Sequence, residues 1–121
     1  MKRMKVLMSI KPEYVNRILS GQKKYEFRRK IWKNKITDVL VYSTSPIQRI
    51  TMAFKVKNII SAPPQLLWDR YHEYSGISKD KFIKYFKNCD TGYAIEIGNI
   101  TNLEPYKLNI RPPQSYMYID D

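Results

Sequence analysis

The sequence has few cysteines, few histidines and no long apolar run, and each shortage excludes a class of protein. Cys89 is the only cysteine among 121 residues, so an internal disulfide framework cannot form, which suits a reducing cytoplasm. One cysteine and one histidine, His72, cannot supply the four ligands of a structural zinc site. We therefore expect no metal, no other cofactor, and a packing or surface role for His72.

No apolar stretch approaches the roughly 20 residues that span a bilayer, so we expect no membrane partner. The opening MKRMKVLMSI places cations before apolar residues, as a signal peptide does. However, Lys5 interrupts it and no small-residue cleavage site follows, so it is better interpreted as a first strand. The glycine-rich phosphate loop, Gly-x-Ser-x-Gly and His-Glu-x-x-His are also absent, as is a recognisable helix-turn-helix.

Acidic residues are scarce, and their distribution is uneven. The chain carries 22 lysines and arginines against 11 carboxylates, a net charge of +11. Residues 1–35 hold 12 of these cations and only two acids, Glu13 and Glu26, so the remaining residues are nearly balanced. Such asymmetry favours a basic face for an anionic partner, most often nucleic acid. A solvated basic surface that serves solubility is the alternative.

Apolar patterns and turn residues predict a small α+β domain. Strands are expected at residues 5–10, 24–29, 38–44, 48–60, 92–98 and 111–119. A short helix should follow the first strand, with Pro12 in its first turn and Gly21 at its end. Two more helices are expected between the fourth and fifth strands, one from the prolines to Gly76 and one starting at Ser78.

Runs of strands with few helices favour a small mixed barrel over a doubly wound parallel sheet. We expect one domain over residues 1–121, built as a mixed β-barrel of about six strands. The early helix and the later helical pair should pack outside it. A doubly wound parallel sheet would need strands and helices in regular alternation, which this sequence lacks.

The stretch SGQKKYEFRRK contains the first constellation able to carry chemistry. Glu26 and Arg28 share a strand face, and Lys23 lies at the helix–strand junction. An arginine beside a carboxylate keeps it ionised, and a desolvated lysine can act as a base or nucleophile. The same groups could instead bind, with the cations on phosphate and Glu26 on an amine or ribose hydroxyl. An exposed ion pair of little energetic value is the third interpretation.

Aromatic rings form a second constellation. The chain has ten tyrosines and two tryptophans, and several lie beside basic residues, as base stacking requires: Tyr25, Trp32, Tyr42 and Tyr116. Half-buried packing is the alternative for most of them. The loop YSTSP, residues 42–46, adds hydroxyls and backbone amides that could hold an anion.

The segment LSGQKKYEFRRK resembles the Gly-x-Lys-x-x-Glu-x-Arg signature of the ASCH family, a branch of the PUA-like β-barrel superfamily. Gly21, Lys23, Glu26 and Arg28 carry the match. The blocks MSIKPEYVNRIL, VLVYSTSP, YHEYSGISKDKFIKYF, GYAIEIGNI and PPQSYMYI are similar to further family blocks. The resemblance therefore covers nearly the whole chain, which looks like a stand-alone member.

This resemblance implies a cleft beside the first helix that holds the motif residues. Family members are often described as predicted transcriptional regulators or RNA-binding proteins, and PUA-like relatives bind RNA or modified bases. We therefore expect RNA or a nucleotide-like ligand as partner, while a protein partner and the oligomeric state stay open. The cleft wall is expected to include further side chains from two loops: Tyr42, Ser43, Ser45, Gln114, Ser115 and Tyr116.

Some small relatives are enzymes, so the resemblance also implies an alternative function. One group removes the acyl group from N4-acetylcytidine, and ribonuclease activity has been assigned to another. The deacylating group has Gly-x-Lys-x-x-Thr-x-Arg and a later glutamate; Lys23 and Arg28 match it, whereas Glu26 replaces the threonine. Glu73 or Ser75 stands near the later position. We expect binding first, with Lys23 and Glu26 catalytic if the protein is a hydrolase or ribonuclease.

Overall fold

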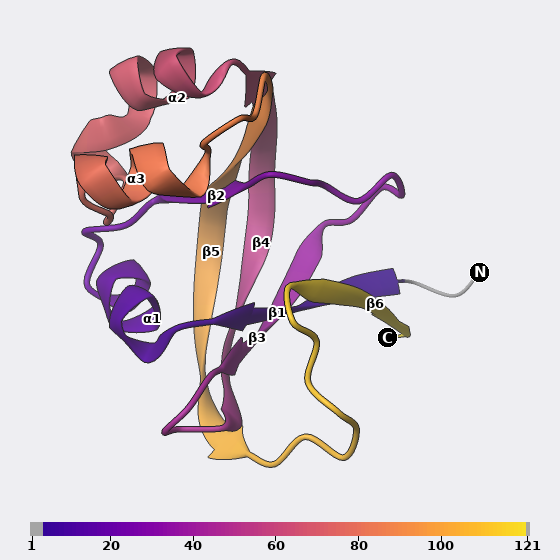
Figure 1. The fold of residues 1–121 in the computed structure, drawn as a ribbon. Helices are drawn as coiled ribbons and strands as arrows, with labels where there is room; N and C mark the ends of the chain where they lie inside the picture. Colours follow the sequence, from indigo (N-terminus) through magenta and orange to yellow (C-terminus); the bar gives the residue numbers. More distant parts are fainter. Residues whose placement is uncertain (1–3, 121) are drawn as a thin grey trace.

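The computed structural model describes residues 4–120. Figure 1 shows the order of the elements along the chain. They are β1 (Met4–Ile10), α1 (Pro12–Leu19), β2 (Tyr25–Arg28), β3 (Asp38–Ser43), β4 (Arg49–Ala62), α2 (Pro64–Tyr71), the 3-10 helix η1 (His72–Tyr74), α3 (Lys79–Tyr85), β5 (Gly92–Tyr106) and β6 (Tyr116–Asp120). None of the described helices is long and apolar enough to cross a membrane.

All six strands belong to one mixed sheet with the order β2-β5-β4-β3-β1-β6. β1 and β3 are parallel, with Met8 opposite Val41, and the other neighbours are antiparallel. The helices lie along one side of the long β5 strand in Figure 1. The α+β class, the six strands and the helical insertion between β4 and β5 confirm the prediction from sequence.

The expected closure into a barrel is not observed, because β2 and β6 form the two edges of the sheet among residues 4–120. The physical reason lies beside β2, which has only four residues. The segment leading into it bonds to the helical insertion: Lys23 bridges to Ser75, and the Lys24 amide donates to the Tyr74 carbonyl at 2.8 Å. With four residues, β2 offers little edge for a closing strand, and the backbone just before it is paired with the insertion.

Two elements also differ from their expected lengths. β5 extends to Tyr106 rather than ending at Gly98, because its exposed second half pairs with β4, for example Thr101 with Ala53. That half lacks a strong apolar alternation, so pairing rather than local pattern makes it a strand. The helix expected from the prolines to Gly76 is divided into α2 and η1.

Apolar side chains form three clusters around the sheet. The largest packs α1 against β1, β3 and β4, and includes Met8, Val15, Ile18 and Phe54. A second lies beneath α2 and α3. The third contains Leu7, Tyr42 and Ile50. Burial of each large side chain stabilises the fold by about 1.5–3 kcal/mol, so α1 and α3 are firmly held where they flank β2.

Candidate functional site

Lys23 is a buried lysine that is held by backbone carbonyls from two segments, α1 and the helical insertion between β4 and β5. Its amide donates to the Arg17 carbonyl at 3.0 Å after Gly21, at φ +84°, turns the chain out of α1. Its ammonium donates to the Ser75 carbonyl at 2.6 Å. Gly76, at φ +62°, packs so closely on the Lys23 stem that a Cβ there would lie 2.5 Å from the Lys23 Cβ. The helical insertion therefore fixes this side chain.

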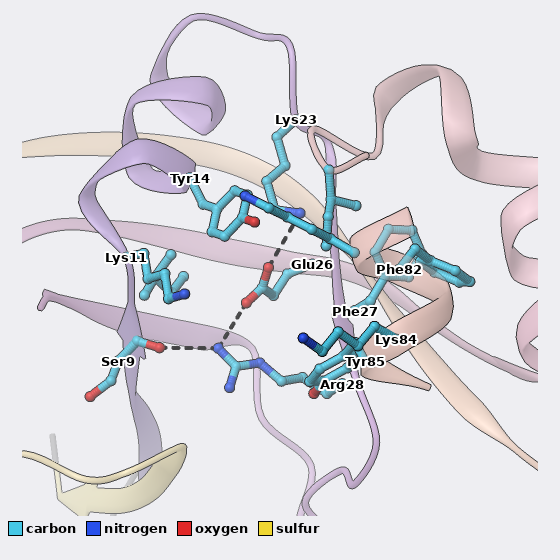
Figure 2. A pocket seen from close by; sticks show the side chains of 13 residues that line it. Ser9, Lys11, Tyr14, Lys23, Glu26, Phe27, Arg28, Phe82, Lys84 and Tyr85 are labelled. Carbon is cyan, nitrogen blue, oxygen red and sulfur yellow. Dashed lines mark hydrogen bonds and ion pairs between the residues drawn. The ribbon is translucent and has the colours of Figure 1, made fainter. Parts of the chain in front are cut away.

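Glu26 lies between Lys23 and Arg28 and contacts both, as Figure 2 shows. The Lys23 ammonium is 3.4 Å from its Oε1, and the Arg28 guanidinium is 2.7 Å from its Oε2. Only 7 % of Glu26 and 3 % of Lys23 are exposed. The exposed ion pair considered from sequence is thus excluded by the geometry, because all three groups are withdrawn from solvent.

Arg28 is held in place by three acceptors. Besides Glu26, its guanidinium donates to the Ser9 carbonyl at 3.1 Å and to the Ser115 hydroxyl at 3.1 Å. These contacts come from β1 and from the segment before β6. Arg28 therefore orients Glu26 and ties β2 to the far edge of the sheet, rather than projecting freely toward a ligand.

Burial and charge pairing act against each other within this cluster. Burial lowers the pKa of Lys23, and the opposing attraction of Glu26 does not restore its ordinary value. Burial alone would raise the pKa of Glu26, but the charges and hydrogen bonds of Arg28 and Lys23 outweigh it and lower the pKa. Glu26 is consequently an ionised acceptor at neutral pH, and Lys23 loses its proton more easily than an exposed lysine.

The three side chains line a cavity of about 430 Å³, which we call the motif pocket. This volume lies within the range of small-molecule sites. Its other walls come from β1 and the residue after it, from α1, β2 and α3, and from the segment before α3: Ser9, Ile10, Lys11, Tyr14, Phe27, Ile77, Lys81, Phe82, Lys84 and Tyr85. The rings of Tyr14 and Phe27 lie 5.4 and 5.5 Å from the Lys23 ammonium. The pocket therefore combines a charged cluster with aromatic walls.

The structure brings together some of the residues singled out from sequence and separates others. Lys23, Glu26 and Arg28 line the motif pocket, and Ser115 contacts Arg28 from outside its lining. Tyr42 packs with Leu7 and Ile50 in the third cluster. The remaining four candidates from the two loops, Ser43, Ser45, Gln114 and Tyr116, also lie outside the pocket lining. Ser43 bonds to Thr51, and Ser45 and Gln114 are exposed.

The aromatic residues expected to stack on bases are also placed elsewhere. Trp32 and Tyr116 pack edge to face at 5.5 Å against the largest cluster. Tyr25 packs on Tyr71 at 4.5 Å. His72 is exposed and lies against Trp68, in agreement with a packing or surface role. The rings that line the pocket were not distinguished by sequence, because each also fits an ordinary apolar position.

Of the two residues considered for the later site position, only one reaches the motif. Ser75 is 2 % exposed and contributes its carbonyl to Lys23, while its hydroxyl donates to the His72 carbonyl at 2.8 Å. Glu73 is exposed on η1. Any residue has a backbone carbonyl, so a contact of this kind does not depend on the type of side chain. The role of Ser75 therefore could not be identified from sequence alone.

Comparisons with known proteins agree with this architecture. A curated relative from Zymomonas mobilis, described as an "ASCH domain-containing ribonuclease", is 25% identical over 126 aligned residues, which cover 97% of this chain and 85% of the relative. The crystal structure of ASCH from Zymomonas mobilis superposes with a TM-score of 0.88 at 25% identity, over 95% of this chain and 87% of that one.

A second kind of relative is much longer than this chain. Large ribosomal subunit protein uL22 from Ureaplasma parvum is 26% identical over 92 residues, which cover 71% of this chain but only 29% of that protein. The family model of the ASCH domain matches residues 8–107. The chain therefore belongs to the ASCH family.

Proposed function

We propose that this ASCH protein binds RNA, or a nucleotide-like ligand, in the motif pocket. The observation that carries the proposal is a buried Lys23–Glu26–Arg28 cluster facing a cavity with aromatic walls. Single-stranded RNA is recognised by stacking of bases on rings and by hydrogen bonds to their edges. The motif pocket offers both kinds of contact.

Within the pocket, the three charged groups would have different tasks. Ionised Glu26 accepts hydrogen bonds, so it suits an exocyclic amine or a ribose hydroxyl. Lys23 suits a carbonyl or phosphate oxygen of the ligand. Arg28 would keep Glu26 ionised and oriented, because its Nη2 donates to Glu26 and to the Ser9 carbonyl while its Nη1 donates to Ser115.

Salt dependence of RNA binding tests this function. We expect fluorescence anisotropy with a labelled single-stranded RNA oligomer to show affinity that falls steeply between low and physiological salt. Glu26→Gln and Lys23→Met should each weaken binding about tenfold, since a buried polar contact contributes about 1–3 kcal/mol. Affinity that does not change with salt, or no binding at low salt, would refute the proposal.

A ribonuclease or other hydrolase is the second candidate function. Two observations favour it: burial lowers the pKa of Lys23, and a relative is described as a ribonuclease. Neutral Lys23 would accept a proton from the attacking hydroxyl or water, with Glu26 relaying it. The proton would then pass to the leaving oxygen or nitrogen as its bond to phosphorus or carbon breaks.

Product analysis separates catalysis from binding. The purified protein is incubated with single-stranded RNA and, separately, with N4-acetylcytidine, beside Lys23→Ala, Glu26→Gln and the exposed control Lys79→Ala. Loss of turnover in the first two variants but not in Lys79→Ala would establish an enzyme. No turnover on either substrate would leave a binding protein.

Three further expectations belong to the proposal. We propose that residues 1–121 form one domain and that the protein acts in the cytoplasm. We further propose that it serves RNA metabolism or transcriptional regulation. The single cysteine supports a reducing compartment. The basic N-terminal segment supports a nucleic-acid partner.

A further inference from the structure

Three exposed lysines line the motif pocket without belonging to its buried cluster. Lys11 lies between β1 and α1, and Lys81 and Lys84 lie on α3. Within residues 4–120, none of the three forms an ion pair with a carboxylate. Three uncompensated cations therefore surround a pocket whose one lining carboxylate, Glu26, is already paired with two others.

The lysines approach the pocket from two directions. Figure 2 shows Lys11 and Lys84 on either side of Glu26, and they come from elements on different sides of the pocket. We call Lys11, Lys81 and Lys84 the rim lysines. A ligand seated on Glu26 would thus have positive charge on both flanks.

The sequence of α3 directs its lysines to the pocket. Lys81 and Lys84 are three residues apart, so they share a helix face, and Tyr85 follows on the same side. Phe82, 3 % exposed, packs beneath them against Phe27. Lys79 lies on the same helix but lines a different hollow, between α2 and α3. Two of the three exposed lysines at the pocket therefore belong to one face of α3, and Lys11 faces them from the other side.

A nucleotide within an RNA strand matches this distribution of charge. Its base is flat and uncharged, which suits the aromatic walls, and a phosphate lies on each side of its ribose. A free nucleoside carries no phosphate and would leave the rim lysines without a partner. A base paired in a duplex could enter only by leaving the stack, which costs a few kcal/mol.

We propose that the motif pocket takes one unpaired nucleotide from inside an RNA strand, with Lys11 contacting the phosphate on one side and Lys81 and Lys84 the phosphate on the other. This inference rests on the proposed RNA binding. It selects a strand-internal substrate over the free modified nucleoside, and single strands over duplexes.

A ligand series tests the substrate class. Calorimetry compares the four nucleosides with their 3′,5′-bisphosphates, and anisotropy compares a labelled single-stranded oligomer with its duplex. At least one bisphosphate should bind tenfold or more tightly than its nucleoside, and the single strand more tightly than the duplex. Nucleosides that bind as well as their bisphosphates, or a duplex that binds as well as the strand, would overturn the inference.

Single substitutions then test the rim lysines themselves. For single strands, each lost phosphate contact should reduce the slope of log affinity against log salt by about 0.7. We expect this change in Lys11→Ala and Lys84→Ala, whereas Lys79→Ala on the same helix should keep the wild-type slope. Thermal unfolding of each variant confirms that these exposed sites leave the fold intact.

The outcomes separate this inference from the proposed function. If the wild-type protein binds RNA but Lys11→Ala and Lys84→Ala have the same slope as Lys79→Ala, the rim assignment is wrong and RNA binding stands. If the wild-type protein binds no RNA even at low salt, the proposed function fails and the inference fails with it.

Discussion

Two hollows lie on either side of Lys23, and they differ in how their charges are paired. The motif pocket encloses Glu26 between two cations, with only 10 % of the Glu26 side chain exposed. The second hollow, which we call the lysine groove, measures about 790 Å³ and is lined by Lys24, Lys55, Lys57, Tyr74 and Glu96, among others. Its ion pairs are exposed to solvent: the Lys57 side chain is 69 % exposed, and its ammonium lies 3.7 Å from the Glu96 carboxylate.

The difference shows why lysine content alone does not mark a binding site. Among the lysines of the groove, Lys57 is already compensated by Glu96 and Lys55 by Asp38, which lies outside the groove lining, and solvent screens both pairs. In the motif pocket, burial makes each charge depend on its partner, while the rim lysines stay uncompensated. The four predictions below test this contrast, starting with the largest expected effect.

Removing the shared carboxylate should cost most. Glu26→Ala leaves Lys23 and Arg28 buried without their anion, so we expect about 3–5 kcal/mol of lost stability. Glu96→Ala in the lysine groove should cost at most about 1 kcal/mol, because its pair is exposed. Urea unfolding of both variants measures the difference. Equal losses would contradict the contrast between the hollows.

The two glycines with positive φ form a matched pair on either side of Lys23. Both Gly21→Ala and Gly76→Ala impose a left-handed backbone on alanine, at about 1–2 kcal/mol each. Only the Gly76 Cβ meets the Lys23 stem, whereas nothing lies within 4 Å of one at Gly21. We therefore expect Gly76→Ala to lose about 1–3 kcal/mol more in denaturant unfolding. Similar losses of stability in both variants would mean that the insertion can shift away from Lys23 at no measurable cost.

Acid should weaken the motif pocket more than the exposed pairs. The pKa of Glu26 is lowered in the folded protein, so its contribution is complete above the unfolded value near 4.3 and is lost as pH falls through the folded pKa. Glu26→Gln should thus flatten the fall in stability below about pH 4.3. Asp38→Asn, at a partly exposed pair whose carboxyl pKa is also lowered, should flatten it less. Unfolding free energies measured between pH 2 and 7 test this order. An Asp38→Asn variant that flattens the pH dependence as much as Glu26→Gln, or more, would contradict the prediction.

The smallest effect is expected in the lysine groove. Lys57→Ala should change RNA affinity less than twofold at physiological salt, because Glu96 already compensates this exposed charge. Anisotropy measured beside Lys84→Ala provides the comparison. A larger loss from Lys57→Ala than from Lys84→Ala would move the RNA-binding surface to the lysine groove.

Most of the fold could be predicted because its signals are local. Ile50, Met52 and Phe54 alternate along β4, and all three are buried as that pattern indicates. Barrel closure could not be predicted in the same way. It depends on the length and neighbours of β2, which has only four residues and is preceded by a contact between the backbone atoms of Lys24 and Tyr74.

The candidate site was predictable only where the residues share one strand. Glu26 and Arg28 meet because alternate residues face the same side of β2. Tyr42 illustrates the limit: Val41 and Tyr42 are both buried, in clusters on different faces of β3. When apolar residues follow one another along a strand, the sequence does not indicate which face of the strand lies toward the pocket. The rim lysines of α3 were also missed, because they lie within residues 36–121, whose charge is nearly balanced.

The carbonyl of Ser75 that holds Lys23 means that the motif pocket is assembled from two separable parts of this chain. The signature lies wholly within residues 21–28, yet one acceptor of its lysine ammonium and one wall of its pocket come from a separate insertion between β4 and β5. A change confined to that insertion would therefore alter how Lys23 is held and would reshape one wall of the pocket while leaving the signature untouched. In this chain the signature supplies the charged floor of the pocket, and a segment some fifty residues later in the sequence supplies the wall that faces it.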